Sequence, residues 1–255
     1  LRDAGVLPAT VGIVGGTPVV GLSASEIELL STRTVAKAST RDLPLAGARG
    51  VHAATTVAAT AWLASRAGVR IFATGGLGGV HRGASRTFDE SADLSALSRI
   101  PVTVVCAGVK SVLDVGATLE RLETLGVSVA GYRTDRFPGF FVADSGFPIP
   151  WTLDGPADVV AAMRSRDELS LDSALVVANP VPPEEQLDPA WHDRLLAEAL
   201  EGAAAAGVKG QAVTPFLLDH LRRGSGGASL EANVAAVRNN VRVAAAIARA
   251  FAASR

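Results

Sequence analysis

Short runs rich in apolar and β-branched residues alternate with longer segments of helical periodicity along the whole chain. The runs IFAT (71–74) and VTVVC (102–106) are apolar nearly throughout, which is typical of strands buried on both faces of a mainly parallel sheet. Seven strands are predicted: Thr10–Val14, Pro18–Gly21, Thr34–Ala38, Arg70–Thr74, Pro101–Cys106, Ser128–Tyr132 and Leu175–Ala178. The alternation predicts an α/β protein of 255 residues, a single domain with a central, mainly parallel sheet between two layers of helices.

Capping signals indicate where helices begin. Three pairs of residues carry such signals: Ser23 with Glu26, Asp188 with Pro189, and Thr214 with Pro215. The second of these helices is expected to run to about Gly207, and a long closing helix is predicted from Ser229 to the C-terminus. Between about residues 133 and 156 the sequence becomes aromatic and rich in Gly and Pro, which predicts a loop or hairpin packed over a site.

The composition restricts the classes of function. The 24 Lys and Arg residues nearly balance the 25 Asp and Glu residues, so no broad electric field would attract nucleic acid or an anionic membrane. No apolar stretch approaches membrane-spanning length. The single Cys106 excludes a disulfide framework and indicates a reducing compartment, so we expect a cytoplasmic protein. The chain begins with Leu1 in what resembles the end of a helix, and we expect residues to precede it.

Polar residues follow the predicted strands at their carboxyl ends, where open α/β sheets bind ligands. After Arg70–Thr74, glycines at 75, 76, 78 and 79 would let the backbone approach a ligand, although glycines are also ordinary turn residues. The next span holds His81, Arg82, Asp89, Ser91 and Asp93. Its acids and hydroxyls could bind a hard cation through oxygen, or they could form a solvated loop that caps a helix.

Lys110 follows the run Pro101–Cys106. A lysine just past a buried strand is partly desolvated, which lowers its pKa toward a nucleophilic neutral amine. Most lysines, however, are solvated surface charges, so this position alone does not establish a catalyst.

The segment Ala54–Val57 is predicted to open a helix. Its free N–H groups and the hydroxyls of Thr55 and Thr56 could form a phosphate cradle, with Lys37 supplying positive charge. A plain N-cap and a surface lysine explain the same residues equally well. Other polar residues have no partner visible in the sequence or could line the exposed face of the last helix: His52, His192, His220, Asn233, Asn239 and Asn240.

Many long segments, in this order, resemble the pseudouridine-5'-phosphate glycosidase family: PATVGIVGG, GLSASEIELL, RDLP, ATTVAAT, FATGGLGGVHRGA, TFDESADL, VTVVCAGVKS, LETLGV, FPGFF, VANPVP and TPFLLDHL. The match covers essentially the whole chain. The resemblance implies an α/β/α fold, a homotrimer and a divalent metal cofactor, usually manganese.

The resemblance also implies roles for individual residues. Lys110, the lysine of VCAGVKS, would attack the anomeric carbon of an opened ribose and hold it as an imine. Asp89 of TFDESADL would be a metal ligand. Substrate contacts are implied at the phosphate for Lys37 and Val57, along the substrate for Ser91, Ala92 and Asp93, and at the base for Thr74, His81 and Asn233.

Two departures from the family pattern are visible. The family's acid is a glutamate in an N-terminal ESTI-type motif, which does not occur in this sequence, and the segment RDAGVLPAT resembles the residues that come after that motif in the family. We therefore expect the glutamate in a preceding segment. Ala53 stands where the family commonly has glycine, with an unexpected His52 beside it, so we expect a change in the phosphate or ring pocket.

The expected chemistry depends on the bond involved. A C-glycoside has no leaving oxygen to protonate, so the usual carboxylate pair would not suffice, whereas a lysine imine provides an electron sink. The expected function is reversible cleavage of pseudouridine 5'-phosphate to uracil and ribose 5-phosphate. The alternatives are a biosynthetic enzyme joining ribose 5-phosphate to an aromatic natural-product ring, and a non-catalytic sugar-phosphate-binding protein. Retention of Lys110, Lys37 and Asp89 argues against the last, and the polar pair Asn233 and His81 favours uracil.

Overall fold

The structure is a computed structural model that describes residues 1–208 and 213–254. Its strands are β1 (Val11–Val14), β2 (Thr17–Val20), β3 (Ala36–Ala38), β4 (Ala53–Thr55), β5 (Ile71–Ala73), β6 (Thr103–Cys106), β7 (Ser128–Tyr132), β8 (Thr152–Leu153) and β9 (Leu175–Ala178). Its α-helices are α1 (Ala24–Thr32), α2 (Leu43–Arg49), α3 (Val57–Arg66), α4 (Ala84–Thr87), α5 (Ala92–Leu97), α6 (Val115–Thr124), α7 (Pro156–Glu168), α8 (Pro189–Ala205), α9 (Val213–Gly224) and α10 (Ala228–Ala253). Short 3-10 turns are η1 (Arg2–Ala4), η2 (Thr40–Asp42) and η3 (Pro183–Glu185).

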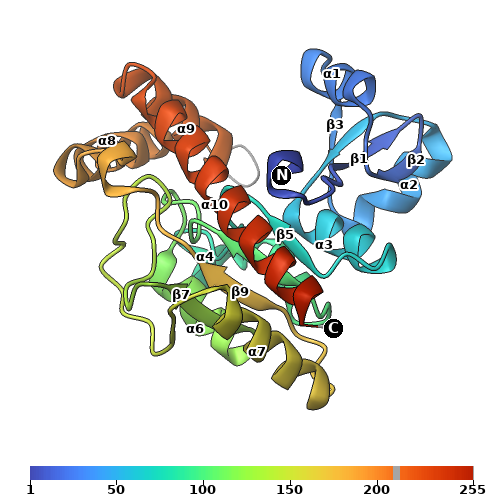
Figure 1. Cartoon of the computed structure of the whole chain (residues 1–255). Coiled ribbons are helices and arrows are strands. Elements are labelled where there is room, and N and C mark those ends of the chain that lie inside the picture. Colours follow the sequence, from blue (N-terminus) through green and yellow to red (C-terminus); the bar gives the residue numbers. More distant parts are fainter. Residues whose placement is uncertain (209–212, 255) are drawn as a thin grey trace.

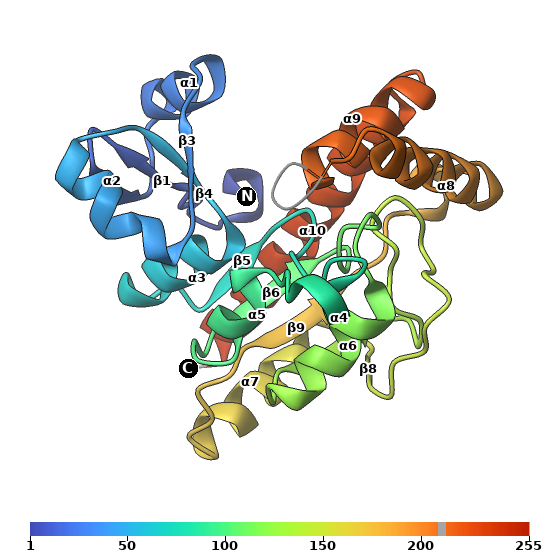
Figure 2. The same ribbon diagram turned by 180° about the vertical axis from the view of Figure 1, so that it is seen from behind.

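The central sheet has the strand order β5-β6-β9-β7-β8, and each neighbouring pair is parallel. Alternate side chains of β6 face opposite cores, with Val104 and Cys106 on one side and Val105 on the other. On the side of Val105 the sheet is covered by α7 and α10, which pack against each other (Figure 1). On the opposite side lie α5 and α6 (Figure 2). The predicted mainly parallel sheet between helical layers is confirmed.

The four N-terminal strands form a second sheet in the order β2-β1-β4-β3. Only β3 and β4 are parallel in this sheet. Three of the strands match predicted runs, but β4 lies where the sequence indicated the start of a helix. Its residues, Ala-Ala-Thr, have little intrinsic preference for a strand, and α3 begins only at Val57. This sheet has a small core of its own, made of Ile13, Ala38, Ala46 and Ala53.

The turn of the β1–β2 hairpin explains the unexpected histidine at position 52. Gly15 and Gly16 have φ angles of 56° and 80°, as a two-residue turn with both φ angles positive requires. The N–H of Gly15 donates to Nδ1 of His52 at 3.0 Å, and Ala53 is fully buried in the adjoining strand. His52 and Ala53 therefore stabilise the second sheet.

Two of the predicted helix starts are confirmed. At α1, the N–H of Ser23 donates to Oε2 of Glu26 at 2.7 Å, while the N–H of Glu26 donates to Oγ of Ser23 at 3.3 Å. At α8, Oδ1 of Asp188 accepts the N–H of Trp191 at 2.8 Å. Both caps satisfy N–H groups that have no partner inside the helix.

The last two helices differ in part from expectation. The chain is already helical at Val213, so Thr214 lies inside α9 and is not its N-cap. The long closing helix is confirmed as α10, but Asn240 is not on an exposed face: it is 0% exposed and its Nδ2 donates to the carbonyl oxygen of Thr74 at 2.7 Å. Although α10 has 26 residues, no helix within the described ranges has both the length and the apolar character needed to cross a membrane.

Most of the loop or hairpin predicted for about residues 133–156 has no regular structure: residues 133–151 contain no helix or named strand, and β8 and the start of α7 lie at the end of that range. An isolated bridge between Arg136 and Pro148 pairs two parts of the loop with each other. A second bridge, between Gly139 and Gly108, pairs the loop with the segment after β6. Because that segment carries Lys110 two residues beyond Gly108, the loop lies close to the candidate nucleophile.

Candidate active site

A cavity of about 780 Å³ lies between the second sheet and the carboxyl ends of β5 and β6. All the site residues predicted from the sequence line it: Lys37, Thr55, Thr56, Val57, Thr74, His81, Asp89, Ser91, Ala92, Asp93, Lys110 and Asn233. The fold therefore brings together side chains that are almost 200 positions apart in the sequence. The structure shows that each of these residues lines the cavity, and their individual roles stay predictions.

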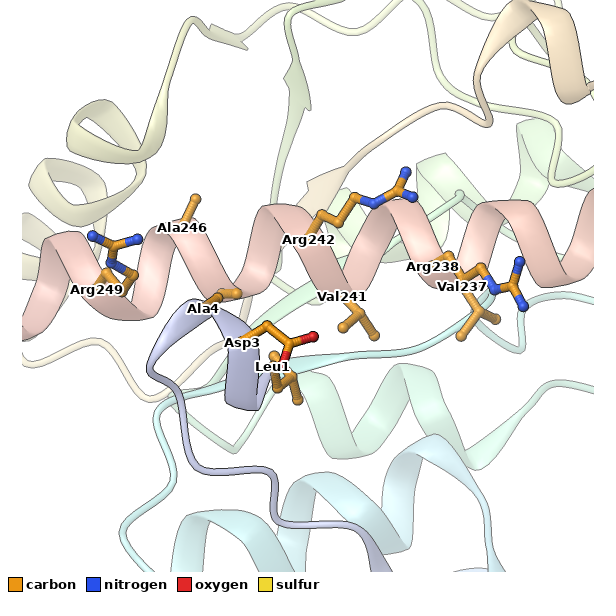
Figure 3. A pocket seen from close by; sticks show the side chains of 10 residues that line it. Leu1, Asp3, Ala4, Val237, Arg238, Val241, Arg242, Ala246 and Arg249 are labelled. Carbon is orange, nitrogen blue, oxygen red and sulfur yellow. The ribbon is translucent and has the colours of Figure 1, made fainter.

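A second hollow of about 570 Å³ lies beside this cavity, between η1 and α10 (Figure 3). Its walls include Leu1 and Asp3 on one side and Arg238, Arg242 and Arg249 of α10 on the other. None of the predicted site residues lines it. The candidate active site is therefore the first cavity.

Lys110 lies at the start of the turn after β6. Its backbone is fixed on both sides, since its N–H donates to the carbonyl oxygen of Leu77 at 3.2 Å and its carbonyl oxygen accepts the N–H of Leu113 at 2.9 Å. Burial lowers the pKa of the Lys110 amine, the charge of Asp93 raises that pKa, and the charge of Lys37 lowers it. Burial is the largest of these influences, so more of the amine is neutral than in a solvated lysine.

The N-terminus of α3 forms one wall of the cavity. Oγ1 of Thr56 caps the helix by accepting the N–H of Ala59 at 3.4 Å, and the N–H of Ala58 donates to Oδ1 of Asp93 at 2.8 Å. The N–H of Val57 has no partner among the hydrogen bonds of the described residues. The helix start is thus both an ordinary cap and an open donor for an anion.

Two cations line the cavity from the side of the second sheet, Lys37 on β3 and Arg41 on η2. Arg41 was not singled out from the sequence, although it belongs to the RDLP segment that carries the family resemblance. Its side chain is 75% exposed, and its Nε lies 3.6 Å from Oδ1 of Asp42. Together with the end of α3, these cations can attract a phosphate group.

The glycine-rich loop after β5 is held by close packing. A Cβ on Gly76 would lie 2.5 Å from Cδ2 of Phe140, and one on Gly78 would collide with Oγ of Ser91. The N–H of Gly78 donates to Oδ2 of Asp93 at 2.8 Å. Since the other carboxylate oxygen of Asp93 binds the first turn of α3, this buried side chain joins the glycine loop to the helix.

Asp89 and His81 lie together in the cavity wall, with Oδ2 of Asp89 3.7 Å from Nδ1 of His81. The neighbouring Glu90 is paired with Arg121 at 2.9 Å. Within residues 1–208 and 213–254, no three His, Cys, Asp or Glu side chains form a metal-binding group. This donor set fits a hard cation held by one carboxylate and completed by water, and it does not fit a site made of several protein ligands.

The lining of the cavity also includes an amide and an aromatic side chain. Asn233 and Thr74 line it, and Asn240, farther along α10, supports the carbonyl group of Thr74 from behind. Phe140 of the aromatic loop lines the same cavity. The sequence indicated that this loop covers a site, but it did not indicate which of its aromatic residues lines the cavity. Ala53 and His52 do not line the cavity, so the expected change of its shape through Ala53 is not supported.

Comparison with known proteins establishes the family. The model of the family described as "Indigoidine synthase A like protein" matches residues 1–250. The chain belongs to this family. A relative from Saccharopolyspora erythraea, named pseudouridine-5'-phosphate glycosidase, is 60% identical over 253 residues, which are 99% of this chain and 84% of the relative. A relative of the same name from Frankia alni is 56% identical, covering 99% of this chain and 70% of its own. The resemblance drawn from the sequence motifs is thereby confirmed.

Two solved structures are similar over nearly the whole chain. The prealnumycin C-glycosynthase AlnA, in complex with ribulose 5-phosphate, has a TM-score of 0.93 and 39% identity, covering 99% of this chain and 84% of that one. An indigoidine synthase A-like protein from Thermotoga maritima has a TM-score of 0.90 and 39% identity, covering 100% of this chain and 83% of that one.

Proposed function

We propose that this protein is an enzyme that reversibly cleaves the C-glycosidic bond of pseudouridine 5'-phosphate to give uracil and ribose 5-phosphate. One observation carries the proposal: a largely buried lysine with a lowered pKa shares a cavity with an open helix N-terminus and a second lysine. Such a cavity offers a nucleophilic amine and a phosphate subsite at once. Relatives that are 45% to 60% identical to this chain carry the name of this activity.

The roles of the residues can be derived from the chemistry of bond formation. In the joining direction, the neutral amine of Lys110 condenses with the C1 aldehyde of open-chain ribose 5-phosphate, and water leaves as the imine forms. A ring carbon of uracil then donates its electron pair to the imine carbon and loses its proton. Closure of the sugar ring by the 4-hydroxyl displaces the lysine nitrogen as the free amine. Cleavage is the reverse sequence: the amine of Lys110 opens the sugar ring at C1, and the ring carbon of uracil is protonated. The carbon–carbon bond then breaks with its electron pair returning to the uracil ring, while the lone pair of the Lys110 nitrogen forms the imine, which water hydrolyses.

The binding residues divide between the two ends of the cavity. We assign the phosphate to the N–H of Val57 and to the cations Lys37 and Arg41, because these groups supply donors and positive charge at one helix end. The remaining substrate-facing residues are assigned to the sugar and the ring: Ser91, Ala92 and Asp93 near the sugar, and Thr74, His81 and Asn233 near the base. Both oxygens of Asp93 already accept backbone N–H groups, so its main task is to hold these segments in place.

A divalent cation, manganese or magnesium, belongs to the same proposal. Asp89 would hold it, with water as the other ligands, and when bound it would supply positive charge near the anionic substrate. The family resemblance supports a homotrimer. The single buried Cys106 and a phosphorylated substrate support a cytoplasmic location.

The second candidate is a C-ribosylating biosynthetic enzyme that joins ribose 5-phosphate to an aromatic natural product by the same imine chemistry. The observation that favours it is the structural similarity to the prealnumycin C-glycosynthase. The two candidates share the sugar half of the site and differ only in the ring that is accepted.

The test uses the natural full-length protein. Incubation with pseudouridine 5'-phosphate should release uracil, and incubation with ribose 5-phosphate plus uracil should consume uracil, as measured by chromatography. The variant Lys110→Met should do neither while keeping the wild-type circular dichroism spectrum. Failure of both reactions in a protein that still captures ribose 5-phosphate on Lys110 would reject uracil in favour of the second candidate.

A further inference from the structure

Two buried amides form a chain of hydrogen bonds that ends at the wall of the candidate active site. Nδ2 of Asn179 donates to Oδ1 of Asn240 at 2.8 Å, and Nδ2 of Asn240 donates to the carbonyl oxygen of Thr74 at 2.7 Å. Asn179 and Asn240 are 3% and 0% exposed, and neither lines the cavity, whereas Thr74 does. Because buried amides are costly unless they are hydrogen-bonded, such a network favours one arrangement of the segments that it joins. The network therefore fixes the direction of the Thr74 carbonyl group.

The direction of this carbonyl group determines where the N–H of Gly75 points. The two groups belong to one trans peptide unit, so they point to opposite sides of the chain. The Thr74 carbonyl points toward α10, which does not line the cavity at Asn240, while Gly75 itself lines the cavity. The N–H of Gly75 has no partner among the hydrogen bonds of the residues that the structure describes. It is therefore an open donor on the cavity side of the peptide unit.

The pairing of the central sheet leaves this N–H free. The strand β5 is at the edge of the sheet, with β6 as its neighbour. The N–H of Thr74 donates to the carbonyl oxygen of Val105 at 3.0 Å, and the carbonyl oxygen of Gly75 accepts the N–H of Ala107 at 2.8 Å. These bonds continue the pairing with β6 past the end of β5 and do not use the N–H of Gly75.

The surroundings of Gly75 are uncharged. The three atoms nearest to a Cβ added there would be Oδ1 of Asn233 at 3.1 Å, Cγ2 of Val237 at 3.3 Å and Cε2 of Phe140 at 3.6 Å. The cations assigned to the phosphate lie on β3 and η2, on the side of the second sheet. A single N–H in an uncharged setting suits a neutral acceptor such as a carbonyl oxygen better than a phosphate, which needs positive charge.

We propose that the N–H of Gly75 binds a carbonyl oxygen of the planar ring, and that Asn240 is the positioning residue that directs this N–H into the cavity. The hydrogen bond that the Thr74 carbonyl accepts also polarises the peptide unit, which makes the N–H of Gly75 a stronger donor. This inference rests on the proposed function and adds a requirement to it: the ring carries a carbonyl group at the edge that faces Gly75.

The first test combines a substitution with altered rings. Uracil, 2-thiouracil and 4-thiouracil are compared as inhibitors of the release of ribose 5-phosphate from pseudouridine 5'-phosphate, since sulfur accepts hydrogen bonds more weakly than oxygen. One of the two thiouracils should inhibit the wild-type enzyme at least about fivefold more weakly than uracil, the loss expected for one hydrogen bond. In Asn240→Leu, which keeps the size of the side chain but cannot donate, this difference should fall below about twofold.

The matched control is Asn239→Leu on the same helix. Nδ2 of Asn239 also donates to a backbone carbonyl oxygen, that of Pro180 at 3.0 Å, but neither residue lines the cavity. This variant should keep the wild-type difference between uracil and the thiouracils. Equal inhibition of the wild-type enzyme by all three compounds, or a difference that persists in Asn240→Leu, would overturn the inference. A purely structural role of Asn240 would lower activity without changing the preference for oxygen over sulfur.

A second measurement leaves Asn240 in place. Hydrogen exchange at the N–H of Gly75 is followed by fragmentation mass spectrometry in the Lys110→Met variant, which should bind substrate without cleaving it. Saturating pseudouridine 5'-phosphate should slow this exchange at least about fivefold, whereas ribose 5-phosphate alone should leave it within about twofold. No slowing, or equal slowing by the two compounds, would overturn the role of Gly75. A wild-type enzyme that neither cleaves pseudouridine 5'-phosphate nor captures ribose 5-phosphate would instead overturn the proposed function itself.

Discussion

At the scale of single residues, the reactivity of Lys110 depends on which charges surround it. Burial and the charge of Lys37 lower the Lys110 pKa, while the charge of Asp93 raises it. Only the neutral amine can attack a carbonyl, so reactivity rises with pH as the amine loses its proton. Because the folded-state pKa is lowered, this rise occurs at lower pH than for a solvated lysine.

The variant Lys37→Met should move this rise to higher pH. Removing the charge of Lys37 removes one influence that lowers the Lys110 pKa, so the neutral amine forms only at higher pH. The measurement is the rate at which trace acetic anhydride acetylates Lys110 as a function of pH, determined by mass spectrometry, which does not depend on phosphate binding. Arg41→Met is the control, since it removes another cation of the cavity that does not act on the Lys110 pKa. A profile of Lys37→Met that stays in place or moves to lower pH would contradict this account.

Asp89→Asn should raise the manganese concentration needed for half-maximal activity about tenfold or more, because one anionic oxygen ligand becomes a neutral amide. The free energy of unfolding should change by less than about 0.5 kcal/mol, since the side chain is partly exposed. Activity is measured after chelation and titration with manganese. Asp144→Asn, at a partly exposed carboxylate outside the cavity, is the control and should leave the requirement unchanged. Full activity of the wild-type enzyme after exhaustive chelation would rule out this role.

At the scale of elements, Asp93 ties the glycine loop to α3 in the wall of the cavity. Its two carboxylate oxygens accept N–H groups from Gly78 and Ala58, each at 2.8 Å. The glycine loop extends from the central sheet and α3 follows the second sheet, so this one buried side chain positions the start of α3 relative to the glycine loop.

Asp93→Asn should therefore lower the free energy of unfolding by about 1–3 kcal/mol, because the amide NH2 cannot accept a hydrogen bond and one backbone N–H loses its partner. Urea denaturation followed by circular dichroism measures the change. Asp89→Asn serves as the comparison, since it makes the same chemical change at a partly exposed position of the same cavity. Equal stability of the two variants would show that the double hydrogen bond of Asp93 does not hold these segments together.

The elements themselves were predictable to different degrees. The runs that became β6, β7 and β9 were apparent from the sequence because each is apolar over most of its length. The short strands β4 and β8 were not, since two or three residues are too few to show a strand pattern and their pairing is fixed by their neighbours in space. The same reason explains why Asn240, buried against the end of β5, was assigned to an exposed helix face.

At the scale of the whole molecule, the sequence predicted the parallel sheet and the members of the cavity but not the division into two sheets. The candidate residues were predictable because they stand at strand ends or in motifs of the family. Phe140 and Arg41 were not, because their approach to the cavity depends on how a loop and a short turn pack against distant segments. The strands β3 and β6 belong to different sheets (Figure 2). Lys37 on β3 and Lys110 after β6 line one cavity only in the assembled fold.

The central claim, that this cavity captures a sugar phosphate as an imine on Lys110, has a direct test. The chain contains three lysines, Lys37, Lys110 and Lys209, so the site of capture can be assigned without ambiguity. The protein is incubated with ribose 5-phosphate, reduced with borohydride and digested, and the peptides are analysed by mass spectrometry. The account predicts a reduced sugar-phosphate adduct on Lys110 that inorganic phosphate suppresses by competition. An adduct on Lys37 with Lys110 unmodified, or no adduct on any lysine, would contradict it.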